Sequence, residues 1–351
     1  MPHSANIDGA ATSRAVAPAR SRGVGAAWAD WRVTLGLKAQ VPVSSIDEIL
    51  AVETPAFARA AKAIVTGDTA MLREALANDP SLVRARSAAS HHATLLHYVS
   101  ANGIESELQS PVANSDEVAA ILLAAGADID APCDAYDGRW ATTMELLVSS
   151  DHPTEAGVAG RLVDLLCSAG AVVDGVRGDG SPLATALCFA TLDCVAALIA
   201  RGARTDNPIF AAAAGRIDWL QSWFDGGSGT PTSPVPAFLP LATDRVVAAE
   251  QALVFACMCG QTEVVRRLLD RGVNVNASPP GSHWTATPLH TGAIQGQTTV
   301  VQLLLQRGAD PTLRDSRHGE TARDWVAHAR GARRALARVV AGLLDRLRPI
   351  A

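Results

Sequence analysis

Two short polar clusters contain the residue types that acid–base chemistry needs. His91 and His92 are adjacent in the sequence, and Asp137 and Arg139 form a second polar cluster further along. A histidine can act as a general base near neutral pH, a carboxylate can orient its ring, and a guanidinium can stabilise developing negative charge. These four residues are therefore the candidate catalytic groups of an enzyme that acts on a small molecule.

A wider polar and aromatic set has the composition of a binding surface. Tryptophan, tyrosine and arginine side chains contribute much of the binding energy in protein interfaces. Because this set overlaps the candidate catalytic groups, residue types alone do not separate a binding protein from an enzyme. The candidate binding residues are His92, Tyr136, Asp137, Arg139, Trp140, Asp179, His283 and Trp284.

Motifs that would specify a reaction or a metal do not occur in the sequence. It contains no nucleophile elbow, phosphate-binding loop, dinucleotide-binding glycine pattern or metalloprotease helix. Cys257 and Cys259 are two positions apart on a predicted helix, so they point to different faces and do not suit a zinc ligand pair. We predict that the six cysteines are reduced core thiols, and we expect no metal and no cofactor.

The composition argues against several partner classes. The chain of 351 residues has a net charge of -5 and a pI near 6.0, so it lacks the positive field that favours nucleic acid or anionic membrane surfaces. It has neither a secretory signal pattern nor an apolar run of the roughly 18 to 20 residues needed to span a bilayer. We expect a cytoplasmic protein that binds neither nucleic acid nor membranes.

The candidate residues lie between helices whose pattern recurs along the chain. The best-formed copy runs from Ala286 to Ala322: it opens with Thr-Pro-Leu-His at 287–290, continues with an apolar helix over 300–305 and stops at Gly308. Threonine can cap the free amides of a helix start, proline suits the first helical turn, and glycine can adopt the left-handed conformation that ends a helix. Weaker copies cover 55–77, 94–130, 141–174, 181–203, 207–229 and 251–277.

This pattern resembles the ankyrin-repeat family. The opening tetrapeptide, the second apolar helix and the closing glycine are marks of that family, whose period is about 33 residues. The resemblance implies an all-α solenoid of about seven helix-turn-helix units with helical caps. It also implies that His97 and His290 hydrogen-bond the loop backbone between units, which leaves His91 and His92 without a third histidine for a metal site.

The resemblance further implies where a partner binds. The loops that precede each first helix, called fingers below, form a concave surface together with the first helices, and relatives usually bind there. The candidate binding residues all lie just before a predicted first helix, so they should line this surface. The implied partner is a protein or peptide, with a small molecule as the open alternative.

The repeats also set the predicted domain boundaries. Residues 1–44 should be a disordered tail, 45–330 the repeat array with a linker-like loop at 225–240, and 331–351 a C-terminal capping helix. In that helix, arginines should face outward. The predicted inward stripe is Leu336, Val339, Val340, Leu343, Leu344 and Leu347.

Two neighbouring units carry insertions at the same place. The segments ELQSPVANS (107–115) and SSDHPTEAG (149–157) separate the two helices of the second and third units. We predict that they pack on each other at one edge, and that Asp151 and His152 form a turn before Pro153. Such walls would suit the enzyme alternative, in which His91 or His92 acts as a base near Asp137 and Arg139.

The leading functional prediction is a scaffold that binds a protein or peptide in the concave groove. The first alternative is an enzyme with a small-molecule acid–base site in the groove of the second and third repeats. The second alternative is an assembly module that associates with itself through an apolar edge. The scaffold and the enzyme would both use the groove, whereas the assembly module would use the apolar edge.

Overall fold

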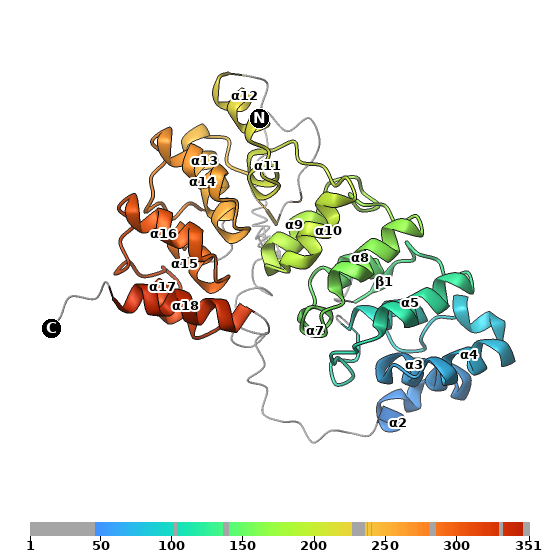
Figure 1. The fold of residues 1–351 in the computed structure, drawn as a ribbon. Coiled ribbons are helices and arrows are strands. Elements are labelled where there is room, and N and C mark those ends of the chain that lie inside the picture. The colour runs from blue at the N-terminus through green and yellow to red at the C-terminus, as the bar shows by residue number, and fades with distance from the viewer. Residues whose placement is uncertain are drawn as a thin grey trace, which may run out of the picture. The chain divides into compact units, whose positions relative to one another are not determined.

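The structure is a computed structural model that describes residues 46–101, 104–135, 140–226, 236, 238–239, 241–280, 286–329 and 333–346. Helices make up almost all of its regular structure (Figure 1). The predicted tail over 1–44 and most of the linker-like loop lie outside the described residues. Within the described part, the two strands are β1 (Cys133–Asp134) and β2 (Trp140–Ala141), which pair antiparallel.

The first helix pair begins and ends at the residues that the sequence predicts. After α2 (Ile46–Ile49) and the short 3-10 helix η1 (Leu50–Val52), α3 (Pro55–Thr66) and α4 (Thr69–Asn78) pack side by side. Thr54 accepts a hydrogen bond from the Phe57 amide at the start of α3, and Gly67 ends it with a φ of 71°. The 3-10 helix η2 (Pro80–Arg84) then leads to the first finger.

Further helix pairs follow in chain order, and each packs against the one before it except at one junction, which is described below (Figure 1). This is the arrangement of a solenoid, in which each unit buries its apolar faces against its neighbours. The pairs are η3 (Leu95–Ser100) with α5 (Ser115–Ala124), α6 (Thr143–Leu147) with α8 (Ala159–Ser168), α9 (Ser181–Phe189) with α10 (Leu192–Ala200), α11 (Pro208–Ala213) with α12 (Ile217–Phe224), α13 (Arg245–Met258) with α14 (Thr262–Asp270), α15 (Pro288–Ile294) with α16 (Thr298–Gln306), and α17 (Ala322–Val326) with α18 (Arg333–Asp345).

A repeated polar contact connects neighbouring pairs. The last carbonyls of a helix have no partner within the helix. Here a side chain at the start of a second helix donates a hydrogen bond to a carbonyl at or near the end of the preceding unit's first helix. The four bonds are Asn114 to Gly67 (2.9 Å), Thr191 to Val148 (2.7 Å), Gln261 to Ala213 (2.9 Å) and Gln297 to Met258 (3.2 Å).

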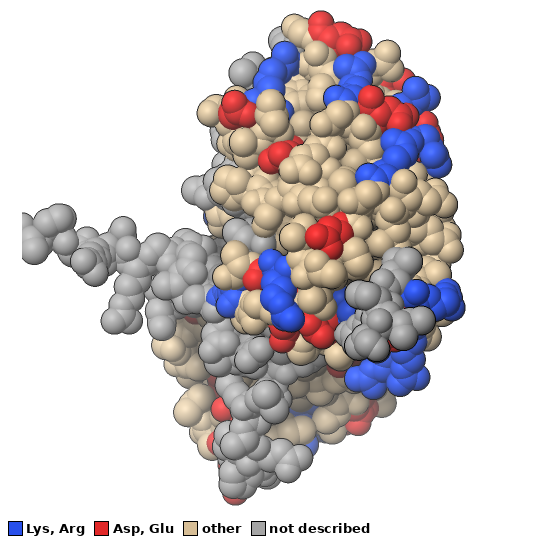
Figure 2. All heavy atoms as spheres, turned by 90° about the vertical axis from the view of Figure 1, so that its left-hand side faces the viewer, with Lys and Arg blue, Asp and Glu red and all other residues tan. Residues whose placement is uncertain are grey.

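Ion pairs connect the second helices on the outer side of the stack. Arg201 binds Asp164 at 2.7 Å, and two further pairs of the same kind follow along the chain: Arg271 with Asp225 (3.0 Å) and Arg307 with Asp270 (2.7 Å). On the face shown in Figure 2, basic and acidic side chains accordingly lie beside one another rather than in separate fields. Exposed pairs of this kind contribute less than about 1 kcal/mol each, so apolar packing carries most of the stability.

The stack changes at the junction between α10 and α11. The residue that would reach back to the preceding unit is Arg216, and its guanidinium binds the Thr205 hydroxyl at 2.9 Å instead. Ala190 ends α9 with a φ of 54°, a conformation that usually requires glycine. The buried apolar residues also divide into two clusters here, with Ile209 and Phe210 of α11 in the first and its two following alanines in the second.

Three predicted details are wrong. Thr287 makes no capping bond to an amide, because its hydroxyl bonds the ring of His290 at 2.7 Å. Asp151 and His152 begin the short helix α7 (Asp151–Glu155) rather than a turn, since proline is tolerated in the first turn of a helix. The first helix of the sixth unit begins at Arg245 rather than Gln251, because Asp244 caps the amides of Val246 and Val247.

The predicted inward stripe of the last helix is also partly wrong. Leu336 and Val339 are 54% and 55% exposed. The face of α18 that packs inward contains smaller residues instead, so the helix is rotated relative to the prediction. Its buried residues are Ala337, Val340, Ala341 and Leu344.

Candidate binding surface

The first finger, residues 85–94, is held in shape by buried and half-buried polar groups. The Glu53 carboxylate accepts hydrogen bonds from the Ser87 hydroxyl and the Ala88 amide. The Arg86 guanidinium donates to the His92 carbonyl at 2.8 Å and to the Pro132 carbonyl of the next finger at 2.7 Å. One arginine therefore fixes this finger and connects it to its neighbour.

His91 is largely enclosed. Its Nδ1 accepts a hydrogen bond from the Ala93 amide at 3.0 Å, so its proton is on Nε2, which donates to Glu105 at 2.8 Å. The His91 and Glu105 side chains are only 12% and 11% exposed. The Tyr98 hydroxyl donates to the same carboxylate oxygen at 3.1 Å. Burial, followed by the charge of Glu105, raises the pKa of Tyr98. Both ring nitrogens of His91 are thus engaged within the protein.

His92 differs from its neighbour because it is exposed. Its backbone has a φ of 48°, and its Nδ1 lies 3.4 Å from the Ser87 carbonyl. A left-handed conformation is uncommon for residues other than glycine and is maintained here by the contacts of Arg86. The structure therefore presents the His92 ring on the outside of a fixed finger.

The second finger, residues 131–141, contains the β1–β2 hairpin. Asp134 pairs with Trp140 across the hairpin, and the Asp134 amide donates to the His91 carbonyl at 2.8 Å. Trp140 is 53% exposed. The structure thus joins the Trp140 hairpin to the His91–His92 segment. Tyr136, Asp137 and Arg139 lie outside the described residues.

The third finger, residues 174–180, contains Asp179. Its carboxylate accepts a hydrogen bond from the Ser181 amide at 3.0 Å and lies 3.3 Å from the Arg177 guanidinium. Arg177 is about half exposed and also binds Glu145 of α6 at 2.8 Å. Asp179 therefore supports the shape of the finger, and Arg177 offers the more accessible charge. His283 and Trp284, predicted for a later finger, lie outside the described residues.

Two buried histidines tie first helices to the fingers that follow them. His97 accepts a hydrogen bond from the Thr94 amide at Nδ1, and its Nε2 donates to the Ala131 carbonyl at 3.0 Å. His290 makes the equivalent contact to the Glu320 carbonyl, also at 3.0 Å. Burial lowers the pKa of His97 to about 4 and also lowers that of His290. The structural role predicted for both residues is confirmed.

Comparison with known proteins agrees with this geometry. A family model for ankyrin repeats, in three copies, matches residues 236–315. The chain therefore contains ankyrin repeats.

Individual relatives match the ankyrin region over short stretches. A putative E3 ubiquitin-protein ligase, XBAT35 of Arabidopsis thaliana, is 45% identical over 60 residues, which is 17% of this chain and 13% of that protein. The mouse tRNA endonuclease ANKZF1 is 41% identical over 70 residues, or 18% of this chain and 9% of that protein. The chain therefore spans only a small part of the length of these relatives. The human ASB11 ankyrin repeat domain aligns with 71% of this chain and 98% of its own at 20% identity, with a TM-score of 0.30.

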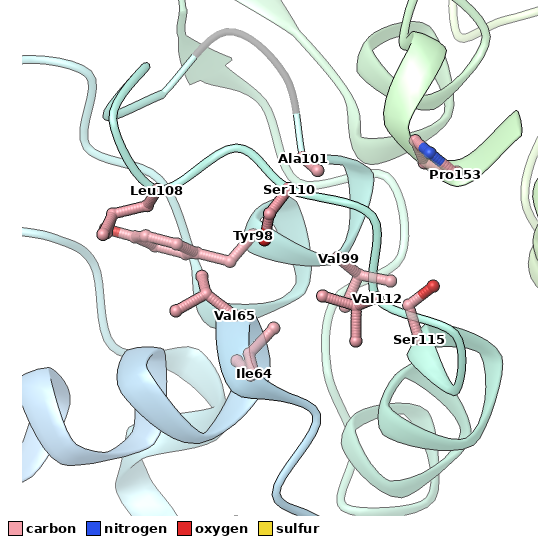
Figure 3. Close-up of a pocket in the computed structure, with 10 residues that line it drawn as sticks. All are labelled: Ile64, Val65, Tyr98, Val99, Ala101, Leu108, Ser110, Val112, Ser115 and Pro153. Atoms are coloured by element: carbon pink, nitrogen blue, oxygen red, sulfur yellow. The ribbon is translucent and has the colours of Figure 1, made fainter. Parts of the chain in front are cut away.

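The two insertions of this ankyrin array lie at the same edge, where they line one small cavity. The Ser150 hydroxyl donates to the Ala101 carbonyl at 3.1 Å. Ser110 and Val112 from the first insertion and Pro153 from the second line one cavity together with Ile64 and other apolar residues (Figure 3). Its volume is only about 10 Å³, whereas ligand pockets hold roughly 300 to 1,000 Å³. The insertions close this edge by packing rather than by forming a substrate pocket.

Several residues that shape the fingers were not identified from the sequence. Glu53, Arg86 and Glu105 act through contacts with residues 14 to 46 positions away in the chain, so no local pattern identifies them. Glu145 could have been found, because Thr142 and Glu145 form a capping box, a pattern of a threonine followed three residues later by glutamate.

In the described part of the chain, no group of three or more His, Cys, Asp and Glu side chains is arranged to hold a metal ion. Among the helices described, none is both long and apolar enough to cross a membrane.

Proposed function

We propose that this ankyrin array binds a protein or peptide partner through its first three fingers. Ankyrin repeats typically bind proteins. The surface we assign to this role contains His92, Trp140 and Arg177, one exposed or half-exposed side chain from each finger. Tyr136, Asp137 and Arg139 belong to the same surface in this proposal because they occupy the second finger in the sequence.

The observation that carries the proposal is the exposure of Trp140 on a fixed hairpin. A large aromatic side chain that stays 53% exposed leaves apolar area available for a partner. Its hairpin is bonded to the first finger by the Asp134 amide and the Arg86 guanidinium. A surface that is already ordered loses little conformational freedom on binding, so this tryptophan is suited to anchor a partner.

The chemistry of the neighbouring fingers supports a peptide with mixed character. Arg177 pairs with Glu145 and Asp179 but keeps about half of its side chain exposed, so its guanidinium can donate a further hydrogen bond to a partner carboxylate, and His92 offers a ring that can donate or accept a hydrogen bond. Since Trp140 supplies the apolar contact between them, the expected epitope has an apolar residue next to an acidic or polar one.

The test is capture by the immobilised full chain, followed by affinity measurement with the purified partner. We expect the double variant His92→Ala/Trp140→Ala to bind at least about tenfold more weakly, because a central aromatic anchor is lost. The matched control is Val246→Ala, which removes another exposed apolar side chain, at the start of α13. Circular dichroism should be unchanged in both variants. Equal capture by the wild type and the double variant would reject the finger surface.

A further inference from the structure

The last helix departs from the pattern of the second helices before it. Gln261 and Gln297 lie against the glycine that ends a preceding first helix, and Leu336 occupies the same place against Gly296. Three residues after these positions come Val264, Val300 and Val339. The first two valines are 2% and 1% exposed, whereas Val339 is 55% exposed.

Leu336 is an apolar residue at a position where the two preceding units have glutamine. The glutamines at the equivalent positions donate hydrogen bonds to carbonyls of the preceding unit. Leucine has no donor, and Leu336 remains 54% exposed. Terminal repeats normally present a polar outer face to water. Exposed leucine and valine on the last described helix therefore indicate a surface that something else covers.

Arginines on α18 differ in their ion pairing from those on the preceding second helices. Arg271 and Arg307 are paired with aspartates. On α18, Asp345 is already paired with Arg323 at 2.8 Å. The remaining exposed arginines have no ion-pair partner in the described part of the chain: Arg334, Arg338 and Arg346.

The spacing of these residues gives the exposed face two edges. At 3.6 residues per turn, Leu336, Val339 and Leu343 fall along one edge and the first two arginines along the other. Small residues, Ala335 and Gly342, lie between the two edges. A Cβ atom at Gly342 would meet nothing within 4 Å, so a partner can approach the backbone closely at this point.

We propose that this face of α18 docks an acidic amphipathic helix of a partner protein. Its acidic edge would lie along Arg334 and Arg338, and its apolar edge along Leu336 and Val339. Charge complementarity supports this occupant, because the three arginines lack partners on a chain whose net charge is -5. The site is separate from the finger surface and does not depend on it.

The test uses two labelled helical peptides that place leucine along one edge and either glutamate or lysine along the other. Fluorescence anisotropy with the full chain should show at least about tenfold tighter binding of the glutamate peptide, with the difference shrinking as salt is raised. The variant Arg334→Glu/Arg338→Glu should lose about tenfold in affinity, and Leu336→Gln should weaken binding by about threefold to tenfold.

A matched control has the same change in net charge at a distant site. Arg73→Glu/Arg84→Glu alters two exposed arginines of the first unit and should change the affinity by less than about twofold. His92→Ala/Trp140→Ala should also leave peptide binding unchanged, so failure of this proposal and failure of the finger surface are distinguishable.

Other outcomes would overturn the proposal. Equal binding of the two peptides, or an equal loss in the control variant, would mean that α18 carries no specific acidic site. Binding to phosphatidylserine vesicles but not to the glutamate peptide would assign the face to a lipid surface. Sedimentation of the wild type as a dimer that Leu336→Gln makes monomeric would assign it to a second copy of the chain.

Discussion

Regular and interrupted helix pairs of the array use their polar side chains for different purposes. In the regular pairs α13–α16, Gln261, Gln297 and Arg307 all contact a neighbouring unit. In the interrupted pairs from η3 to α8, Asn114 makes the same kind of contact, but Glu105 and Glu145 also bind His91 and Arg177 of the fingers. Polar groups of the regular pairs thus hold neighbouring units together, whereas polar groups found only in the interrupted pairs shape the surface proposed to bind a partner.

Acid should destabilise both regions through their buried histidines, and this is the largest effect we expect. His97 has a pKa of about 4 in the folded chain, against an ordinary value near 6.5 when unfolded. Between these values the unfolded state binds a proton that the folded state does not, so the free energy of unfolding falls as pH falls. The loss for His97 reaches about 3 kcal/mol at the lower value. Urea unfolding across this pH range measures it.

Variants at the two buried histidines separate the pH dependence of the interrupted region from that of the regular region. His97→Gln should lower stability at neutral pH and flatten the pH dependence of the interrupted region, since its neutral side chain cannot be protonated. His290→Gln should do the same for the regular region, where burial also lowers the pKa of the histidine. An unchanged pH profile in His97→Gln would contradict the assignment of the acid sensitivity to this group.

The residues that end two first helices provide a smaller test with effects of opposite sign. Gly260 has a φ of 72°, and a Cβ atom there would lie 2.5 Å from the Gln297 side chain. Gly260→Ala should therefore cost about 1 to 3 kcal/mol. Ala190→Gly relieves a φ of 54° at the end of α9 and should raise stability by up to about 1 kcal/mol. Thermal unfolding checks both, and destabilisation by Ala190→Gly would show that the turn after α9 is not strained.

The sequence was most informative where residues act locally. The Thr-Pro-Leu-His start at 287–290 and the glycines at 67 and 308 correctly predicted helix ends, because a proline in the first turn and a left-handed turn at the end depend on a few adjacent residues. The rotation of α18 was missed because leucine and valine look alike whether they face a core or a partner. Its buried face is chosen by what fits against α15 and α16.

The candidate site was only partly predictable for a similar reason. His91 and His92 are neighbours with equal chemical capacity in the sequence. Their roles separate only when Glu105, from the segment between η3 and the insertion, reaches His91 and leaves His92 outside. Trp140 was identified by residue type, but its link to the first finger depends on the contact between Asp134 and His91.

Hydrogen–deuterium exchange of the full chain with its captured partner tests the proposed finger surface most directly. We predict that binding slows amide exchange in the first three fingers, over 86–94, 131–135, 140–141 and 177–181. Exchange in α14 and α16 of the regular region should be unchanged. Slower exchange confined to α14 and α16, with none in the fingers, would contradict the division of roles between the two regions.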